Sequence, residues 1–169
     1  MEKIDIYDKN RKYTGKTIIR NNGKIDLQQG EYIIVVKCWI INEKNEVLLT
    51  QRRQDKLNGG TWEPTGGMVI SGETSIEAIK RELNEEIGLN IENRNIQLID
   101  KDKEEHCFRD MYIIKDSIPL NEIHFNDGEV TDAKYVSIDE FRHMIETNEI
   151  SKWNESFLEL YKKIIHNKI

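Results

Sequence analysis

Cysteine and proline are scarce in this sequence, which has two of each in 169 residues. Cys38 and Cys107 lie far apart and lack the spacing of metal ligands. We therefore expect two buried, reduced thiols instead of a disulfide or a zinc site. Pro64 and Pro119 mark no linker, and the sequence has neither an internal repeat nor a low-complexity segment. This organisation predicts one continuous domain over residues 1–169.

Long apolar runs and an excess of positive charge are missing as well. No run approaches the roughly 18 apolar residues of a membrane span, and the start, MEKIDIYDKN, lacks the basic-then-apolar layout of a secretory signal. We therefore expect no membrane partner and a cytoplasmic location. The formal net charge of −6 argues against a binder of nucleic acid polymers, which usually has a basic surface. A small anionic substrate remains allowed if a metal ion supplies positive charge.

Short segments with the apolar pattern of strands are present along the chain, interleaved with helical patterns. The run YIIVVKCWII at 32–41 is long and β-branched, as in a central strand that is buried on both faces. The turn NEKN then leads into EVLLTQRR at 46–53, so 32–53 is expected to form a hairpin. Further strands are expected at 3–8, 95–100, 107–115 and 132–137. Strands interleaved with helices predict an α/β or α+β layered domain, with helices covering a mixed sheet.

Capping residues and the helical period predict three helices. Thr74 and Glu77 form a capping box that begins a helix near residue 75, and Gly88 ends it after about thirteen residues. Ser137 and Glu140 have the same spacing at the start of a second helix. The last predicted helix has an apolar and aromatic stripe, which we expect in the core and not around a cofactor: Trp153, Phe157, Tyr161 and Ile164.

Three acidic residues gather on one side of the first predicted helix. Glu82, Glu85 and Glu86 are helical neighbours, and like charges at this spacing cost a few tenths of a kcal/mol per pair. They border the apolar sector of the helix, which consists of Ile76, Ile79, Leu83 and Ile87. One interpretation is a solvated acidic face. The other is a cluster in a cleft that binds a hard divalent cation such as Mg²⁺.

Arg81 and the glycine-rich stretch before the helix extend this pattern. Arg81 lies one turn before Glu85 and is placed to pair with it or with Glu73 in the preceding loop. The segment GGTWEPTGGMVISGE permits a close backbone approach, so its carbonyl groups are candidates for further metal ligands.

These residues resemble the Nudix box, G-x5-E-x7-R-E-U-x-E-E-x-G-U, in which U is aliphatic. Every specified position of the box is filled over 67–89, in order by Gly67, Glu73, Arg81, Glu82, Leu83, Glu85, Glu86, Gly88 and Leu89. The N-terminal stretches DIYDKNRKYTGK and GEYIIVVKCWI are similar to the subgroup of Nudix hydrolases related to isopentenyl diphosphate isomerase. One departure is the order Pro64, Thr65, Gly66, Gly67, where many members of the family have Pro-Gly-Gly.

The resemblance implies a Nudix-type α/β/α sandwich around a mixed sheet. It implies a single domain over 1–169, with 1–30 as an N-terminal extension packed on it. The implied reaction is metal-dependent hydrolysis of a phosphoanhydride bond in a nucleoside diphosphate linked to another moiety. The implied ligands of Mg²⁺ or Mn²⁺ are Glu82, Glu85, Glu86 and the carbonyl group of Gly67, and the implied structural fork joins Glu73 to Arg81.

Several further residues are candidates for the chemistry. Hydrolysis requires a base that activates water, and the candidates are Glu85 in the box and Glu129 in the loop NDGEV, with Glu104 and Glu105 as weaker ones. Glu129 is otherwise a solvated loop acid. Two arginines at the end of a strand, Arg52 and Arg53, are candidates for substrate phosphates, and one of them is expected to point away. Trp62 either stacks on a base or packs in the core.

Two other functions remain open from the sequence. An isomerase related to isopentenyl diphosphate isomerase requires a catalytic cysteine in its own motif, whereas Cys38 lies in an apolar strand. A non-catalytic Nudix domain that senses a ligand tends to lose acids of the box, and none is lost here. The sequence leaves the substrate undecided among nucleoside diphosphate derivatives, and it leaves a homodimer open, since relatives often pair.

Overall fold

A computed structural model describes residues 2–21, 25–150 and 155–166 of the chain. Its helices and strands follow the order β1 (Glu2–Tyr7), β2 (Tyr13–Arg20), β3 (Ile33–Ile41), β4 (Val47–Arg52), β5 (Trp62–Glu63), α1 (Ser75–Ile87), β6 (Ile96–Lys103), β7 (Cys107–Lys115), the 3-10 helix η1 (Leu120–Glu122), β8 (Val130–Val136), α2 (Ile138–Glu146) and α3 (Glu155–Ile165). None of the helices in these ranges is long and apolar enough to cross a membrane.

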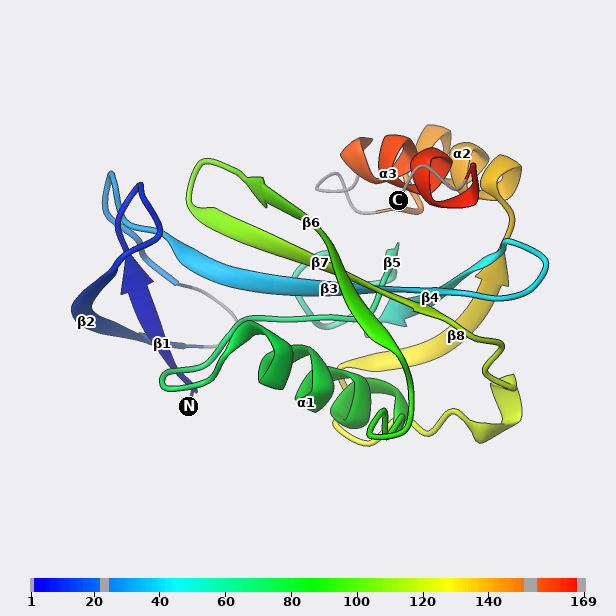
Figure 1. The fold of residues 1–169 in the computed structure, drawn as a ribbon, viewed down its shortest axis with the longest axis horizontal. Helices are drawn as coiled ribbons and strands as arrows, with labels where there is room; N and C mark the ends of the chain where they lie inside the picture. The colour runs from blue at the N-terminus through cyan, green and yellow to red at the C-terminus, as the bar shows by residue number, and fades with distance from the viewer. Residues whose placement is uncertain (1, 22–24, 151–154, 167–169) are drawn as a thin grey trace.

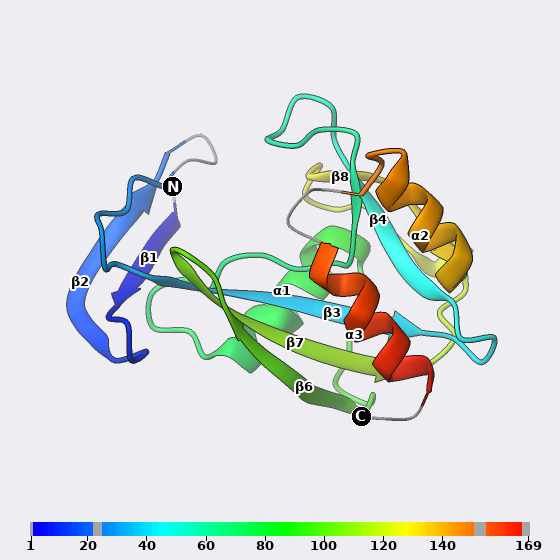
Figure 2. The same ribbon diagram turned by 90° about the horizontal axis from the view of Figure 1, so that it is seen from above.

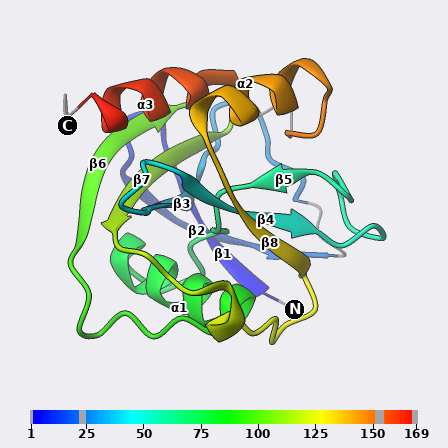
Figure 3. The same cartoon turned by 90° about the vertical axis from the view of Figure 1, so that its right-hand side faces the viewer.

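The expected mixed sheet between helical layers is confirmed. Six strands form it in the order β5-β4-β3-β7-β6, and β8 pairs with β4. Strands β3 and β7 run parallel, whereas the other pairs in this sheet are antiparallel. Figure 3 shows α1 on one side of the sheet and α2 with α3 on the other.

Strand β3 explains how one sheet supports both layers. Its alternate side chains Cys38 and Ile40 belong to the core cluster that packs against α1. Trp39 and Ile41 belong to the second cluster, which includes residues of α2 and α3. Side chains on a strand alternate between faces, so an apolar residue at nearly every position is what burial on both faces requires. This confirms the expected central strand.

Both predicted limits of α1 and the predicted start of α2 are confirmed. Both hydrogen bonds of the capping box are present at Thr74, and Gly88 ends α1 in the left-handed conformation with φ of 69°. The Ser137 side chain accepts a hydrogen bond from the backbone of Glu140 at the start of α2. Three members of the predicted stripe on α3 are buried in the core, namely Phe157, Tyr161 and Ile164, while Trp153 lies outside the described residues.

Several pairings were not expected from the sequence. Strand β2 pairs with β1 in a separate two-stranded sheet, and Figures 1 and 2 show this hairpin at one end of the molecule. The side chains of β2 are exposed or half-buried, so it lacks the apolar alternation that identifies a strand. Strand β5 has only two residues, and it is a strand because it pairs with β4. The parallel pairing of β3 with β7 depends on contacts between distant segments.

The hairpin β1–β2 packs against the loop that precedes α1. Ile4 forms an isolated antiparallel bridge with Ile70, and the Ser71 backbone N–H donates to the carbonyl group of Lys3 at 2.7 Å. Ile4 and Ile6 are buried. The N-terminal strand therefore supports the loop that leads into the acidic helix.

Candidate functional site

Glu86 is a buried acid on the side of α1 that faces the glycine pair. It is 3% exposed, and its carboxylate accepts a hydrogen bond from the backbone N–H of Gly66 at 3.3 Å. Among the described residues it has no cationic side chain within 4.0 Å. A buried carboxylate without a counter-ion is costly, so this position favours either a bound proton or a bound cation.

Arg81 gathers the other acids of the segment. Its guanidinium donates to both oxygens of Glu73 at 3.0 Å, to Glu82 at 2.8 Å and to Glu85 at 3.0 Å. It also donates to the carbonyl group of Met68 at 3.0 Å. The structure thus brings together the expected fork and additionally links Arg81 to two of the expected metal ligands.

The glycine pair is the point where the loop approaches both the sheet and the helix. A Cβ on Gly67 would lie 2.2 Å from a carboxylate oxygen of Glu82, and a Cβ on Gly66 would lie 2.0 Å from the carbonyl oxygen of Val36. The carbonyl oxygen of Gly67 accepts a hydrogen bond from Val36 at 2.8 Å. Because a carbonyl oxygen has two lone pairs, this leaves one available to a further ligand.

Burial controls the protonation of the acids on α1. It raises the pKa of Glu86 well above its ordinary value, and the nearby charges of Glu82 and Glu63 add to the effect while Lys37 opposes it. Burial also raises the pKa of Glu82 to about 7, against the opposing influence of Arg81. Two adjacent carboxyl groups thus hold protons more tightly than usual, which a bound cation would reverse.

The donor set fits a hard divalent cation, although the acids do not converge in this conformation. Across the described ranges, no group of three or more His, Cys, Asp or Glu side chains is arranged as a metal site. Glu82 and Glu85 point to Arg81, and Glu86 points to Gly66. Carboxylate and carbonyl oxygens are nevertheless the ligands that Mg²⁺ and Mn²⁺ prefer. Convergence on one ion requires rotation of side chains on a fixed helix.

Beside these acids lies an ion cluster that the sequence pattern did not reveal. Glu63 accepts from Lys37 at 2.8 Å and from Arg52 at 2.9 Å. Burial alone would raise the pKa of Glu63, but the Lys37 and Arg52 charges hold it below its ordinary value. A signal was available, because a lysine in the middle of a strand that is buried on both faces requires an anionic partner.

The two arginines predicted to bind substrate phosphates point in different directions. The sequence had predicted that one of them would point away from the site. Arg52 points to Glu63 and to the carbonyl group of Leu57 at 3.0 Å. Arg53 is a surface residue whose guanidinium pairs with Asp55 at 2.5 and 2.8 Å. Arg52 therefore lies in the ion cluster beside the acidic helix, and Arg53 does not.

The candidate bases lie in three different places. Glu129 pairs with Lys56 at 2.8 Å, and its backbone carbonyl group accepts from Arg53 at 2.9 Å. Burial raises the pKa of Glu129, but this effect is outweighed by the nearby positive charges, of which Lys56 is the main one. The pKa of Glu129 therefore lies below its ordinary value. Glu85 is held by Arg81 on the helix. Glu104 and Glu105 follow β6, and Glu104 forms an ion pair with Arg109.

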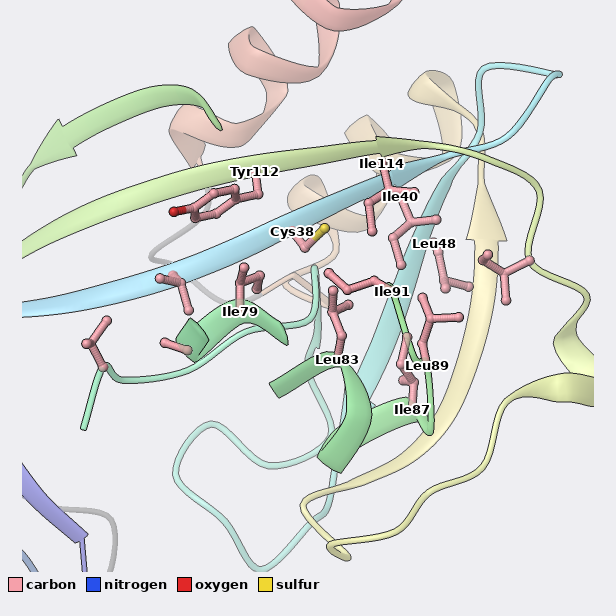
Figure 4. Packing of buried hydrophobic residues seen from close by; sticks show 14 of the residues in the cluster. Cys38, Ile40, Leu48, Ile79, Leu83, Ile87, Leu89, Ile91, Tyr112 and Ile114 are labelled. Atoms are coloured by element: carbon pink, nitrogen blue, oxygen red, sulfur yellow. The ribbon is translucent and has the colours of Figure 1, made fainter. Parts of the chain in front are cut away.

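The burial of Trp62 and Cys38 favours structural roles for both. Trp62 is 8% exposed in the core cluster, and the Lys134 ammonium lies 4.8 Å from its ring centroid. Of its two open roles, burial favours packing. Cys38 is 1% exposed, and Figure 4 shows it among apolar side chains between β3, β7 and α1. Burial raises the pKa of the Cys38 thiol and raises that of Cys107 to about 11, so both are protonated at neutral pH.

Comparison with known proteins agrees with the fold and the acidic segment. Residues 31–161 match the family model described as the NUDIX domain. A Nudix hydrolase of Listeria monocytogenes is 32% identical over 151 residues, which cover 88% of each chain. An isopentenyl-diphosphate Delta-isomerase of Pectobacterium atrosepticum is 30% identical over 137 residues, which cover 74% of each chain. The crystal structure of DR0079 from Deinococcus radiodurans is similar in fold, with a TM-score of 0.79 at 20% identity, and the match covers 96% of this chain and 98% of that one.

Proposed function

Because this chain belongs to the Nudix hydrolase family, we propose that it hydrolyses a phosphoanhydride bond in a nucleoside diphosphate linked to another moiety, with Mg²⁺ or Mn²⁺ as cofactor. The observation that carries the proposal is the position of Glu86. It is 3% exposed, has no cation within 4.0 Å in the described part of the chain, and lies on the same helix as Glu82 and Glu85.

The proposed ligands are Glu82, Glu85, Glu86 and the carbonyl group of Gly67. When bound there, a divalent ion supplies positive charge that offsets the charge of substrate phosphates and lowers the pKa of a bound water. The backbone N–H of Gly66 orients the carboxylate of Glu86. Arg81 holds the loop that precedes α1 against the helix through its two hydrogen bonds to Glu73.

The proton of the attacking water requires an acceptor, and Glu85 and Glu129 are the two candidates. Each is ion-paired, Glu85 with Arg81 and Glu129 with Lys56. A lowered pKa keeps the carboxylate of Glu129 ionised at neutral pH and therefore able to take a proton, although it also weakens the base. Comparing the pH–rate profiles of Glu85→Gln and Glu129→Gln assigns the role. The variant that lacks the base loses the acidic limb of the profile.

The test of the function is a substrate panel. It contains nucleotide sugars, ADP-ribose, dinucleotides, oxidised nucleoside triphosphates and coenzymes, each incubated with Mg²⁺ and scored for nucleoside monophosphate and phosphate. We expect at least one substrate to be cleaved and cleavage to stop when a chelator is added. Cleavage that is unaffected by a chelator, or by Glu86→Gln, would contradict the proposed role of the acids.

One relative favours an isomerase as the second candidate. The similarity to an isopentenyl-diphosphate Delta-isomerase extends over 137 residues. Cys38 and Cys107 argue against this activity, because burial raises the pKa of both thiols and Cys38 is 1% exposed. Incubation with isopentenyl diphosphate, followed by analysis for dimethylallyl diphosphate, decides between the two. We expect no product.

A further inference from the structure

The carboxylate of Glu63 holds one cation on each of its oxygens. The Lys37 ammonium lies 2.8 Å from Oε2, and the Arg52 guanidinium lies 2.9 Å from Oε1. The three side chains are 14%, 15% and 12% exposed for Lys37, Arg52 and Glu63. Taken by themselves, these three side chains carry one excess positive charge in a largely buried cluster that solvent still reaches, and the acids of α1 lie beside them.

This cluster lies directly beside the acidic helix. The Cα of Lys37 would be only 2.9 Å from a Cβ on Gly66, whose backbone N–H donates to Glu86. Strand β5, which carries Glu63, pairs with the end of β4 that carries Arg52.

Both cations retain hydrogen-bond donors. A lysine ammonium has three N–H donors, and the described residues accept one of them, at Glu63. Arg52 uses Nε for the carbonyl group of Leu57 and Nη1 for Glu63, and within the described ranges Nη2 has no acceptor. Glu63 therefore fixes the spacing and direction of two partly used cations. Such an arrangement suits the non-bridging oxygens of a phosphate or diphosphate group, which can accept from the Nη2 group of Arg52 and from the ammonium of Lys37.

We propose that Lys37 and Arg52 form the subsite that binds the diphosphate of the substrate, with Glu63 as its positioning residue. This inference rests on the proposed function, since it supplies the anion-binding half of a site whose cation-binding half is the acidic helix. When the acids of α1 hold the proposed metal ion, they no longer balance the second cation of the cluster. A phosphate oxygen of the substrate would then supply the negative charge that completes it.

Binding of methylenediphosphonate, a diphosphate that cannot be hydrolysed, tests the subsite by calorimetry in the presence of Mg²⁺. We expect Kd to rise about ten- to a hundredfold in Lys37→Met and in Arg52→Gln, because each loses a charge-assisted hydrogen bond. Lys37→Arg should recover part of the loss. Lys162→Met is the matched control, since Lys162 pairs with Glu159 on α3, away from the cluster, and it should bind like the wild type.

Steady-state kinetics on the best substrate of the panel gives the second measurement. Lys37→Met is expected to raise KM about tenfold while the Mg²⁺ half-saturation changes less than about threefold. Tighter Mg²⁺ binding with unchanged KM would overturn the subsite, because Lys37 would then act only as a counter-ion of the helix acids. Thermal melting shows whether each variant folds. If Lys37→Met does not fold, the Kd and KM of Arg52→Gln test the subsite.

The two proposals fail in different ways. If the wild type cleaves no member of the panel but binds methylenediphosphonate, and Lys37→Met weakens that binding, the subsite stands and the proposed function is wrong. If the wild type is active and Lys37→Met and Arg52→Gln keep the wild-type Kd and KM, the subsite is wrong and the function stands.

Discussion

The carboxylate of Asp110 accepts a hydrogen bond on each oxygen from the Arg11 guanidinium, at 2.7 and 2.5 Å, although the two residues are 99 positions apart. Asp110 also accepts from the hydroxyl group of Ser75, the first residue of α1, at 2.6 Å. The pair therefore ties the turn between β1 and β2 to strand β7 and to the start of the acidic helix.

Removal of Arg11 should destabilise the protein. The side chain of Asp110 is 2% exposed, so Arg11→Ala leaves a buried charge without its cation. We expect the free energy of unfolding to fall by about 2–3 kcal/mol in urea denaturation. The control is Arg142→Ala, whose partner Asp139 is on the surface and whose loss should cost less than about 0.5 kcal/mol. Equal effects of the two variants would contradict the role of the pair.

Glu86→Gln should change stability and activity in opposite directions. Without metal it removes a buried carboxyl group that lacks a counter-ion, so we expect a gain on the order of 1 kcal/mol, about 3 °C in Tm. With Mg²⁺ the hydrolytic rate should fall about a thousandfold. Thermal melts in a chelator and rate assays measure the two effects. Glu146→Gln, at an exposed position of α2, should change neither.

The stability of the metal-free protein should fall as pH rises. In the folded protein the pKa of Glu82 is raised from 4.5 to about 7, and that of Glu86 is raised as well. Between these values the folded state binds more protons than the unfolded chain, so the stability present below pH 4.5 is lost as pH rises through the folded pKa. Melting curves from pH 4.5 to 8 in a chelator measure this loss. Saturating Mg²⁺ should reduce the slope, and an unchanged slope would argue that the ion binds elsewhere.

Arg81→Lys tests whether the guanidinium fork matters beyond its charge. Lysine keeps the positive charge but cannot donate to both oxygens of Glu73 and also to Glu82 and Glu85. We expect a lower Tm and a Mg²⁺ half-saturation raised about tenfold, because the loop loses its anchor. Lys80→Arg, one residue earlier at an exposed position, is the control. Normal Mg²⁺ dependence in Arg81→Lys would show that charge suffices.

The two glycines before the helix should respond differently to alanine. In Gly66→Ala the new Cβ meets the backbone of Val36 at 2.0 Å, so the fold must shift and stability falls. In Gly67→Ala it meets the carboxylate of Glu82, the flexible end of a side chain, at 2.2 Å. Gly67→Ala should therefore keep most of its stability and lose about ten- to a hundredfold in activity. Melts and rates of the two variants, measured in parallel, check this difference.

The sequence predicted the acidic helix α1 well, because the signals that define this helix lie within the helix and next to its ends. The capping box at Thr74, the stop at Gly88 and the helical period place Glu82 and Glu86 beside the buried stripe without reference to the rest of the chain. The strand β2 was missed because its side chains are exposed or half-buried and give no alternating pattern.

By itself the sequence determined both limits of α1, the doubly buried strand β3 and the order of acids along α1, since each depends on residues a few positions apart. Only the tertiary structure decided which charges meet. Lys37 and Glu63 are 26 residues apart, and Arg11 and Asp110 are 99 apart, so their contacts depend on strand pairing and chain closure. Burial and distance, which set the pKa of a carboxylate and the partner of a cation, exist only in the folded chain.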